Sequence, residues 1–157
     1  MSHANRWMSV VLTGMLSLAW CLGALSAEPK SPDMVKMGLR ILAGVYGDMD
    51  RKLAADQFDR LPHENQEFQE GSGALRDAIA HEPRDFKSRV TSALDKTLAD
   101  ANQVAQASKS HDRMQVQMAL HALAESLTSL NALFPEALRA EPGTVAPGRP
   151  QGAPAAH

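Results

Sequence analysis

The sequence predicts an all-α fold, an antiparallel up-down-up-down bundle of four helices. Apolar residues recur at alternating spacings of four and three over residues 110–139, which lays one continuous apolar seam along a helix. Three earlier segments carry seams of the same kind, and the connections between them are short. Aromatic residues make up only 4% of the chain, which is typical of helical bundles rather than β-sandwiches.

Turn and cap residues place the boundaries of the first two helices. The first helix is predicted from Ser31, as its cap, to about residue 55, with Pro32 in its first turn. The second is predicted from about Pro62 to about residue 80. Gly71-Ser72-Gly73 lies in its middle, and glycine costs about 1 kcal/mol in a helix interior. We therefore expect the second helix to kink or break there.

The last two helices are bounded in the same way. The third is predicted over residues 84–107, directly after Pro83, and the fourth begins with Ser110 as its cap. Pro135 has no backbone N–H to donate and crowds the preceding turn. We therefore expect the fourth helix to kink or stop there, with residues 136–139 as a loose last turn.

Residues 1–27 have the pattern of a secretory signal peptide. Arg6 gives a basic start, the stretch from Trp7 to Ala27 carries no charge, and its last four residues are Ala24-Leu25-Ser26-Ala27. Small residues at the end of an apolar run are those that signal peptidase accepts. Cleavage would leave an exported chain without a membrane anchor. An uncleaved anchor is the alternative, because the run is nearly long enough to span a bilayer.

The remaining composition excludes several classes of function. Cys21 is the only cysteine, so the chain after residue 27 has no disulfide, thiolate metal site or cysteine nucleophile. A formal net charge of −2 gives no indication of a nucleic-acid surface. Residues 141–157 are rich in proline and glycine without an apolar period, which predicts a disordered tail after a bundle of residues 28–140.

No catalytic motif is present in the sequence. It contains no nucleophile with a base at fixed spacing, no His-Glu-x-x-His run and no phosphate-binding loop. Its carboxylates alternate with lysines and arginines along the solvent faces of the predicted helices. We therefore expect a protein without enzymatic activity.

Methionine and histidine share one face of the fourth helix. His111, Met114, Met118 and His121 are spaced three, four and three apart. Thioethers with imidazoles suit Cu(I) or Ag(I), although binding is expected to be weak without acidic or cysteine partners. The alternative is an outer face that packs on the third helix or on a second subunit, which leaves a homodimer open.

Two helix starts supply a second set of possible metal ligands. His63, Glu64, His111 and Asp112 are expected at the same end of the bundle, and two imidazoles with a carboxylate suit Zn²⁺. The alternative is that they serve as caps and first-turn residues, where polar and acidic side chains are common. His121 is expected to be a partly exposed side chain.

Runs in the last two predicted helices are similar to those of a known family. The runs are Ala124-Glu125-Ser126-Leu127, Asn131-Ala132-Leu133-Phe134 through Arg139, Asp85-Phe86 and Ala99-Asp100-Ala101-Asn102. With them, residues 33–139 resemble the periplasmic four-helix-bundle cytochromes, namely the soluble b-type cytochrome and cytochrome c-prime. The resemblance implies the bundle fold and the periplasm.

The resemblance also implies where a haem would be held. In the b-type family a methionine at the start of the first helix is a haem ligand, and Met34 or Met37 matches it. The second ligand is a histidine near the end of the last helix, where this chain has Pro135. Cytochrome c-prime carries a Cys-x-x-Cys-His motif there, and Leu130 to Phe134 contain neither residue. The haem site is therefore expected to be degenerate.

We thus expect no bound cofactor and a binding or stress-related accessory protein for an unknown protein or small ligand. The alternatives are a haem b electron carrier with atypical ligation and a Cu/Zn binder. Haem at His121 would need Tyr46 or Met49 opposite it. Without haem, large side chains must fill the haem end, because protein interiors are close-packed. We expect Phe134 to be buried there against the first helix. The other expected fillers are Met34, Met37, Ile41, Leu130 and Leu138.

Overall fold

The computed structural model describes residues 29–140, which form four α-helices. The helices are α1 (Pro32–Ala54), α2 (Leu61–Ala78), α3 (Arg84–Ala107) and α4 (Arg113–Asn131), with 3-10 turns at Phe58–Arg60, Ser108–Ser110 and Glu136–Leu138. No strand occurs among the described residues, so the predicted all-α class is confirmed. None of these helices combines the length and the apolar character needed to cross a membrane. The predicted signal peptide and tail lie outside the described residues.

Prolines and one aspartate set where the helices begin. Pro32 and Pro62 lie in the first turns of α1 and α2, where a missing N–H costs no helix hydrogen bond. Asp112 caps α4, because its carboxylate accepts hydrogen bonds from two backbone N–H groups of the first turn. The predicted cap at Ser110 is wrong, since its hydroxyl donates back to the carbonyl of Ala107. Ser31 precedes α1 but makes no capping hydrogen bond.

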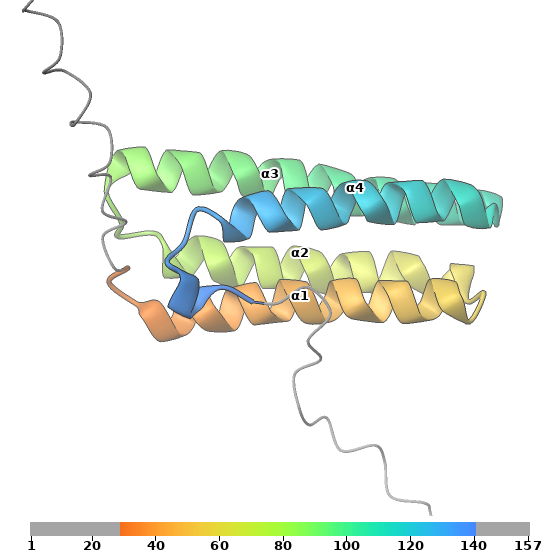
Figure 1. The fold of residues 1–157 in the computed structure, drawn as a ribbon, viewed down its shortest axis with the longest axis horizontal. Coiled ribbons are helices and arrows are strands. Elements are labelled where there is room, and N and C mark those ends of the chain that lie inside the picture. Colours follow the sequence, from red (N-terminus) through yellow and green to blue (C-terminus); the bar gives the residue numbers. More distant parts are fainter. Residues whose placement is uncertain (1–28, 141–157) are drawn as a thin grey trace, which may run out of the picture.

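Each helix packs against its neighbour in the chain, and α4 also packs against α1. Figure 1 shows α1 beside α2 in one layer and α3 beside α4 in the other. At one end Asp56, which follows α1, pairs with Arg113 at the start of α4 at 2.8 Å. Elsewhere the N–H of Lys30 donates to Glu82, which lies between α2 and α3, at 2.6 Å. The connections are therefore tied to helices that are distant in sequence.

Aliphatic side chains fill the centre, together with Phe68 and Phe134, the largest fully buried residues. Polar groups join the helices at its edge. Asn65 of α2 donates to the side chain of Asn102 of α3 at 2.9 Å. The buried carboxylate of Glu64 in α2 pairs with Lys52 of α1, which supplies the partner that a buried charge needs.

The seam between α1 and α2 closes around two glycines. A Cβ atom at Gly38 would lie 3.1 Å from the Cβ of Leu75, and one at Gly71 would lie 2.6 Å from Cγ2 of Ile41. Glycine therefore lets the two backbones approach each other. The break predicted for α2 does not occur, because the helix runs without interruption from Leu61 to Ala78. Burial of its apolar face against α1 outweighs the cost of about 1 kcal/mol for each glycine.

The end of α4 differs from the prediction. The helix stops at Asn131, and Pro135 begins a separate 3-10 turn. A residue before proline avoids the α conformation, so the helix ends upstream. The Asn131 amide then donates to the carbonyl of Ala140 at 2.9 Å, which holds the returning chain. Phe134 is 1% exposed, which confirms that it is buried. Its ring meets Phe86 of α3 edge-on at 5.7 Å between centroids, whereas the prediction had placed it against the first helix.

Met34, Met37 and Ile41 do not fill this end of the fold, contrary to the prediction. Their exposed fractions are 47%, 54% and 38%, whereas Val35 on the same helix is fully buried. The turn Glu136–Leu138 packs against α1 instead, and Leu138 is buried. The chain that follows Pro135 therefore fills space that the prediction had assigned to the methionines.

Candidate functional site

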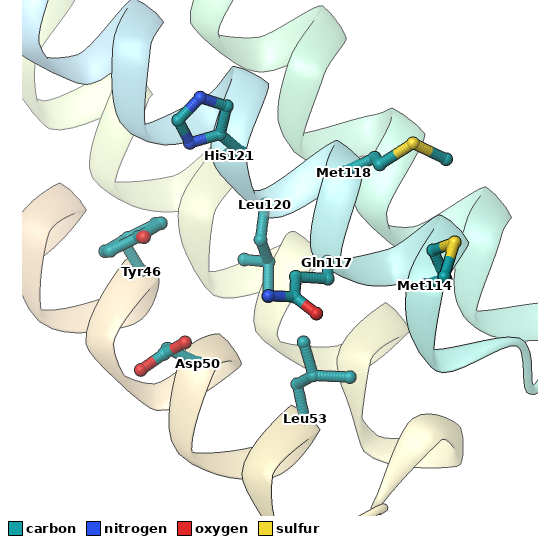
Figure 2. A pocket seen from close by; sticks show the side chains of 8 residues that line it. All are labelled: Tyr46, Asp50, Leu53, Met114, Gln117, Met118, Leu120 and His121. Carbon is teal, nitrogen blue, oxygen red and sulfur yellow. The ribbon is translucent and has the colours of Figure 1, made fainter.

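A groove of about 450 Å³ lies between α1 and α4. Figure 2 shows the side chains that line it: Tyr46, Asp50 and Leu53 from α1, and Met114, Gln117, Met118, Leu120 and His121 from α4. Leu53 and Leu120 are buried, with exposed fractions of 5% and 3%, and give the groove an apolar base. Its size lies within the usual range for small-molecule sites, about 300–1,000 Å³.

The polar groups of the groove come from both helices. Tyr46 and Asp50 are one turn apart on α1, and Gln117 and His121 are one turn apart on α4. Figure 2 shows the phenol and the carboxylate on one wall, with the amide and the imidazole carried by the facing helix. An apolar base with a few polar groups around it is the usual composition of a ligand site.

Tyr46 is partly buried, and both its burial and the nearby carboxylate of Asp50 affect the pKa of its phenol. Burial raises the pKa of its phenol above the ordinary value of 10.0, and the carboxylate of Asp50 raises it further, because both disfavour the phenolate. The phenol is therefore a neutral hydrogen-bond donor near pH 7. Tyr46 is the only tyrosine of the chain, and both tryptophans lie in residues 1–27, so in a chain without those residues its emission would be a single probe of the groove.

Three residues of the predicted methionine/histidine face line this groove. Met114 and Met118 are 70% and 61% exposed, and the His121 side chain is 78% exposed. These values contradict the alternative in which the face is covered by α3. Figure 2 shows the two sulfur atoms near one end of the groove and the imidazole near the other. The exposed position expected for His121 is confirmed.

His111, the fourth residue of that face, is held elsewhere. Its Nε2 lies 3.1 Å from Oδ1 of Asp59, and its ring packs against that of Phe58 with 5.5 Å between centroids. Its backbone is left-handed, with φ of 53°, where the chain turns into α4. His111 therefore joins two connections, and the face is reduced to three residues.

The residues considered for zinc also have other partners. Nε2 of His63 lies 3.4 Å from the carboxylate of Glu67 on the same helix. Glu64 is buried against Lys52, and Asp112 caps α4. No three His, Cys, Asp or Glu side chains within residues 29–140 are grouped so that they could hold a metal ion. The geometry thus favours the cap and ion-pair interpretation of these residues.

The haem place implied by the cytochrome resemblance is filled by protein. Met34 and Met37, the predicted haem-side residues, are exposed. Leu130 and Phe134 are buried near the end of the bundle where the haem would enter. Pro135 has no nitrogen to coordinate iron. The residues at this place therefore do not fit a haem.

The groove as a whole was not predicted from the sequence. It singled out Met114, Met118 and His121, and it placed Tyr46 opposite His121 only as a haem alternative. Asp50, like Gln117, was missed, because a solvent-facing polar residue on a helix carries no signal of its own. The available signal was Tyr46, a polar-tipped residue within the apolar seam of the first helix.

A second depression, of about 460 Å³, lies on α3 alone. Its lining consists of Arg84, Lys87, Ser88, Thr91, Ser92 and Asp95. Side chains of one exposed helix cannot enclose a ligand between two walls. The groove between α1 and α4 is therefore the stronger candidate.

Comparison of the chain with protein-family models, with curated proteins and with solved structures finds no match. The cytochrome resemblance therefore stays a prediction from the sequence.

Proposed function

We propose that this chain is an exported, periplasmic protein that acts by binding rather than by catalysis. The signal-peptide pattern of residues 1–27 supports export, and the resemblance to periplasmic bundle cytochromes supports the compartment. We infer that its helices form an antiparallel up-down-up-down bundle. The short connections support this arrangement, as do the Asp56–Arg113 pair and the hydrogen bond from Lys30 to Glu82.

The groove between α1 and α4 is the observation that carries the binding proposal. Its base, Leu53 and Leu120, is almost fully buried, so the apolar surface open to an occupant is mainly that of Met114 and Met118, which are exposed. Covering apolar surface is favourable by about 25 cal/mol per Å², so an occupant of this groove gains free energy by displacing water from it. The phenol of Tyr46 supplies a hydrogen-bond donor that orients such an occupant.

The polar groups of the groove support recognition rather than acid–base catalysis. In the described part of the chain, no hydrogen bond joins Tyr46, Asp50 and His121 to one another, and His121 instead lies 3.4 Å from Glu125. A catalytic nucleophile requires a base within hydrogen-bonding reach. The lining contains no serine, threonine or cysteine to serve as one. We therefore favour a small apolar or amphipathic ligand.

A haem-binding electron carrier with atypical ligation is the second candidate. It is favoured by Tyr46 and His121, which line the same groove from two helices. Tyrosine and histidine both serve as axial ligands of haem iron in proteins. Such a haem would lie between α1 and α4 and away from Phe134, which occupies the place implied by the family.

A neutral apolar dye such as Nile red tests binding in the groove. The matched variants are Gln117→Phe, which places a ring in the groove, and Gln115→Phe, which changes the same residue type outside it. We expect one dye per chain, a change in Tyr46 emission, and affinity at least about tenfold weaker in Gln117→Phe only. No dye binding, or equal weakening in both variants, contradicts the proposal.

The absorption spectrum of protein purified from the periplasm separates the two candidates. A colourless protein supports the first. Strong absorption in the blue that is lost in both Tyr46→Phe and His121→Ala supports the haem carrier. The intact mass of the same sample tests export, and a mass that still includes residues 1–27 contradicts it.

A further inference from the structure

We propose that the rim of the groove binds one soft monovalent cation, Cu(I) or Ag(I), through the thioethers of Met114 and Met118 and the imidazole of His121. This inference deepens the proposed function, because the three residues line the same groove. The ligand of this site is a cation, whereas the apolar base of the groove favours an apolar ligand. The geometry, exposure and charge of the rim carry it.

The exposure of the two methionines is the first observation. Met114 and Met118 are 70% and 61% exposed, whereas Met49 on α1 is fully buried and serves the core. Single exposed apolar side chains are common on protein surfaces. Here two thioethers one turn apart share an exposed stripe with a histidine. The stripe thus presents three soft or borderline ligand atoms to solvent together.

The spacing allows the three side chains to meet at one ion. Met118 is four residues after Met114 and three before His121, and side chains at these spacings have Cβ atoms about 5–6 Å apart. Met114 and His121 are two turns apart, about 10.5 Å along the helix, so they can share an ion only if it lies beside Met118, between them. Figure 2 shows the sulfur atoms apart from the imidazole, so binding requires the side chains to rotate. Exposed side chains change rotamer within picoseconds to nanoseconds, and methionine has three rotatable bonds. Met118, in the middle, is the natural bridging ligand.

The surroundings leave the imidazole available and favour a cation. Within residues 29–140 the one ion pair of the imidazole is with Glu125 of α4, at 3.4 Å, and such exposed pairs contribute about 0–1 kcal/mol. Asp50 on the facing wall and Glu125 on α4 add negative charge near the rim. Two thioethers and one imidazole suit Cu(I) and Ag(I), whereas hard divalent ions prefer oxygen ligands.

The chain supplies a matched control for this site. Met34 and Met37 are also exposed, at 47% and 54%, and lie on one face of α1 three residues apart. No histidine occurs within four residues of either one. A site that needs only exposed thioethers would use both pairs equally. A site that needs His121 as a third ligand uses only the pair on α4.

Titration with silver nitrate in chloride-free buffer tests the proposal, with Cu(I) under anaerobic conditions as a second probe. The variants are Met114→Leu with Met118→Leu, the control Met34→Leu with Met37→Leu, and His121→Gln. We expect one ion per chain at a dissociation constant of about 1 μM, and affinity at least about tenfold weaker in the α4 pair and in His121→Gln only. The ¹³C resonances of the Met114 and Met118 methyl groups should shift on binding.

Three outcomes overturn the cation site. They are no Ag(I) binding to the unmodified chain, equal weakening by the two methionine pairs, and full affinity in His121→Gln. All substitutions are at exposed positions, so helicity measured by circular dichroism should not change. Nile red binding tests the groove itself, so its persistence without Ag(I) binding overturns only the cation site.

Discussion

Helix α1 meets two neighbours in different ways. Toward α2 its surface carries Gly38, and the seam closes so tightly that an added Cβ would touch Leu75. Toward α4 the same helix presents Tyr46 and Asp50, and the seam opens into a groove. Both seams have leucines beneath them, so apolar content does not distinguish them. The difference lies in the residues at the edge of each contact, which are small in one seam and long or polar in the other.

The two seams also differ in what they can do. Close-packed backbones leave no room for a ligand, and the apolar surface between them is already buried in the fold. An open seam keeps part of its apolar surface for an occupant. The five predictions below test this contrast, beginning with the largest effect.

Phe134→Ala should have the largest effect, because it empties the closed end of the fold near the last turn of α4. We expect a loss of about 3–5 kcal/mol in the free energy of unfolding, the usual range for a buried phenylalanine. Denaturant unfolding measures it. A loss under about 1 kcal/mol, or a rise in stability of the unmodified chain on adding haemin, would mean that this end is an open cavity.

Gly38→Ala should destabilise the closed seam. The new Cβ would lie 3.1 Å from the Cβ and 3.2 Å from the Cα of Leu75, whose backbone cannot turn aside. Overpacking costs about 1–3 kcal/mol, which exceeds the gain of about 1 kcal/mol in helix propensity. We therefore expect a net loss of about 1 kcal/mol in thermal or denaturant unfolding. An increase in stability would show that the seam is looser than described.

Gly44→Ala is the matched control on the same helix. A Cβ at Gly44 would have no atom within 4 Å, so only helix propensity and backbone entropy change. We expect a gain of about 0.5–1 kcal/mol in the same unfolding assay. If Gly44→Ala and Gly38→Ala changed stability alike, the close approach to Leu75 would not be what distinguishes them.

The smallest effect should be electrostatic and confined to the groove. Burial and the carboxylate of Asp50 both raise the pKa of Tyr46, so Asp50→Asn should lower that pKa toward 10.0 without removing the effect of burial. Ultraviolet titration of the single tyrosine measures this shift. A Tyr46 pKa that is unchanged in Asp50→Asn would mean that the carboxylate does not act on the phenol.

The raised pKa of Tyr46 also determines whether its contribution to the free energy of unfolding rises or falls with pH. The unfolded chain loses its phenol proton near pH 10 and the folded chain only above that value, so the unfolded state binds fewer protons between the two. The contribution of Tyr46 is therefore fully present below pH 10 and is lost as the pH rises through the folded pKa. Tyr46→Phe should remove this part of the alkaline loss of stability.

Some features were predictable because they depend on local sequence. The seam residues Leu120, Leu123 and Leu127 are buried as their spacing predicts. The break before Pro135 also follows from local chemistry, although its position was set too late, because the residue before proline already avoids the helix. Gly71 was misread, since its helix cost is local but its benefit comes from Ile41 on another helix.

By itself, then, the sequence determined the helices, because an apolar period of three and four residues and the turn residues between segments act within a few positions. Tertiary structure alone decided which seam closes and which opens, because that depends on side chains that meet from different helices. In the tertiary structure His111 contacts Asp59 and does not join the other residues of its predicted face. Met114 and His121 line a groove together with Tyr46 of α1. In the tertiary structure Met34 is exposed, and the turn after Pro135 packs against α1.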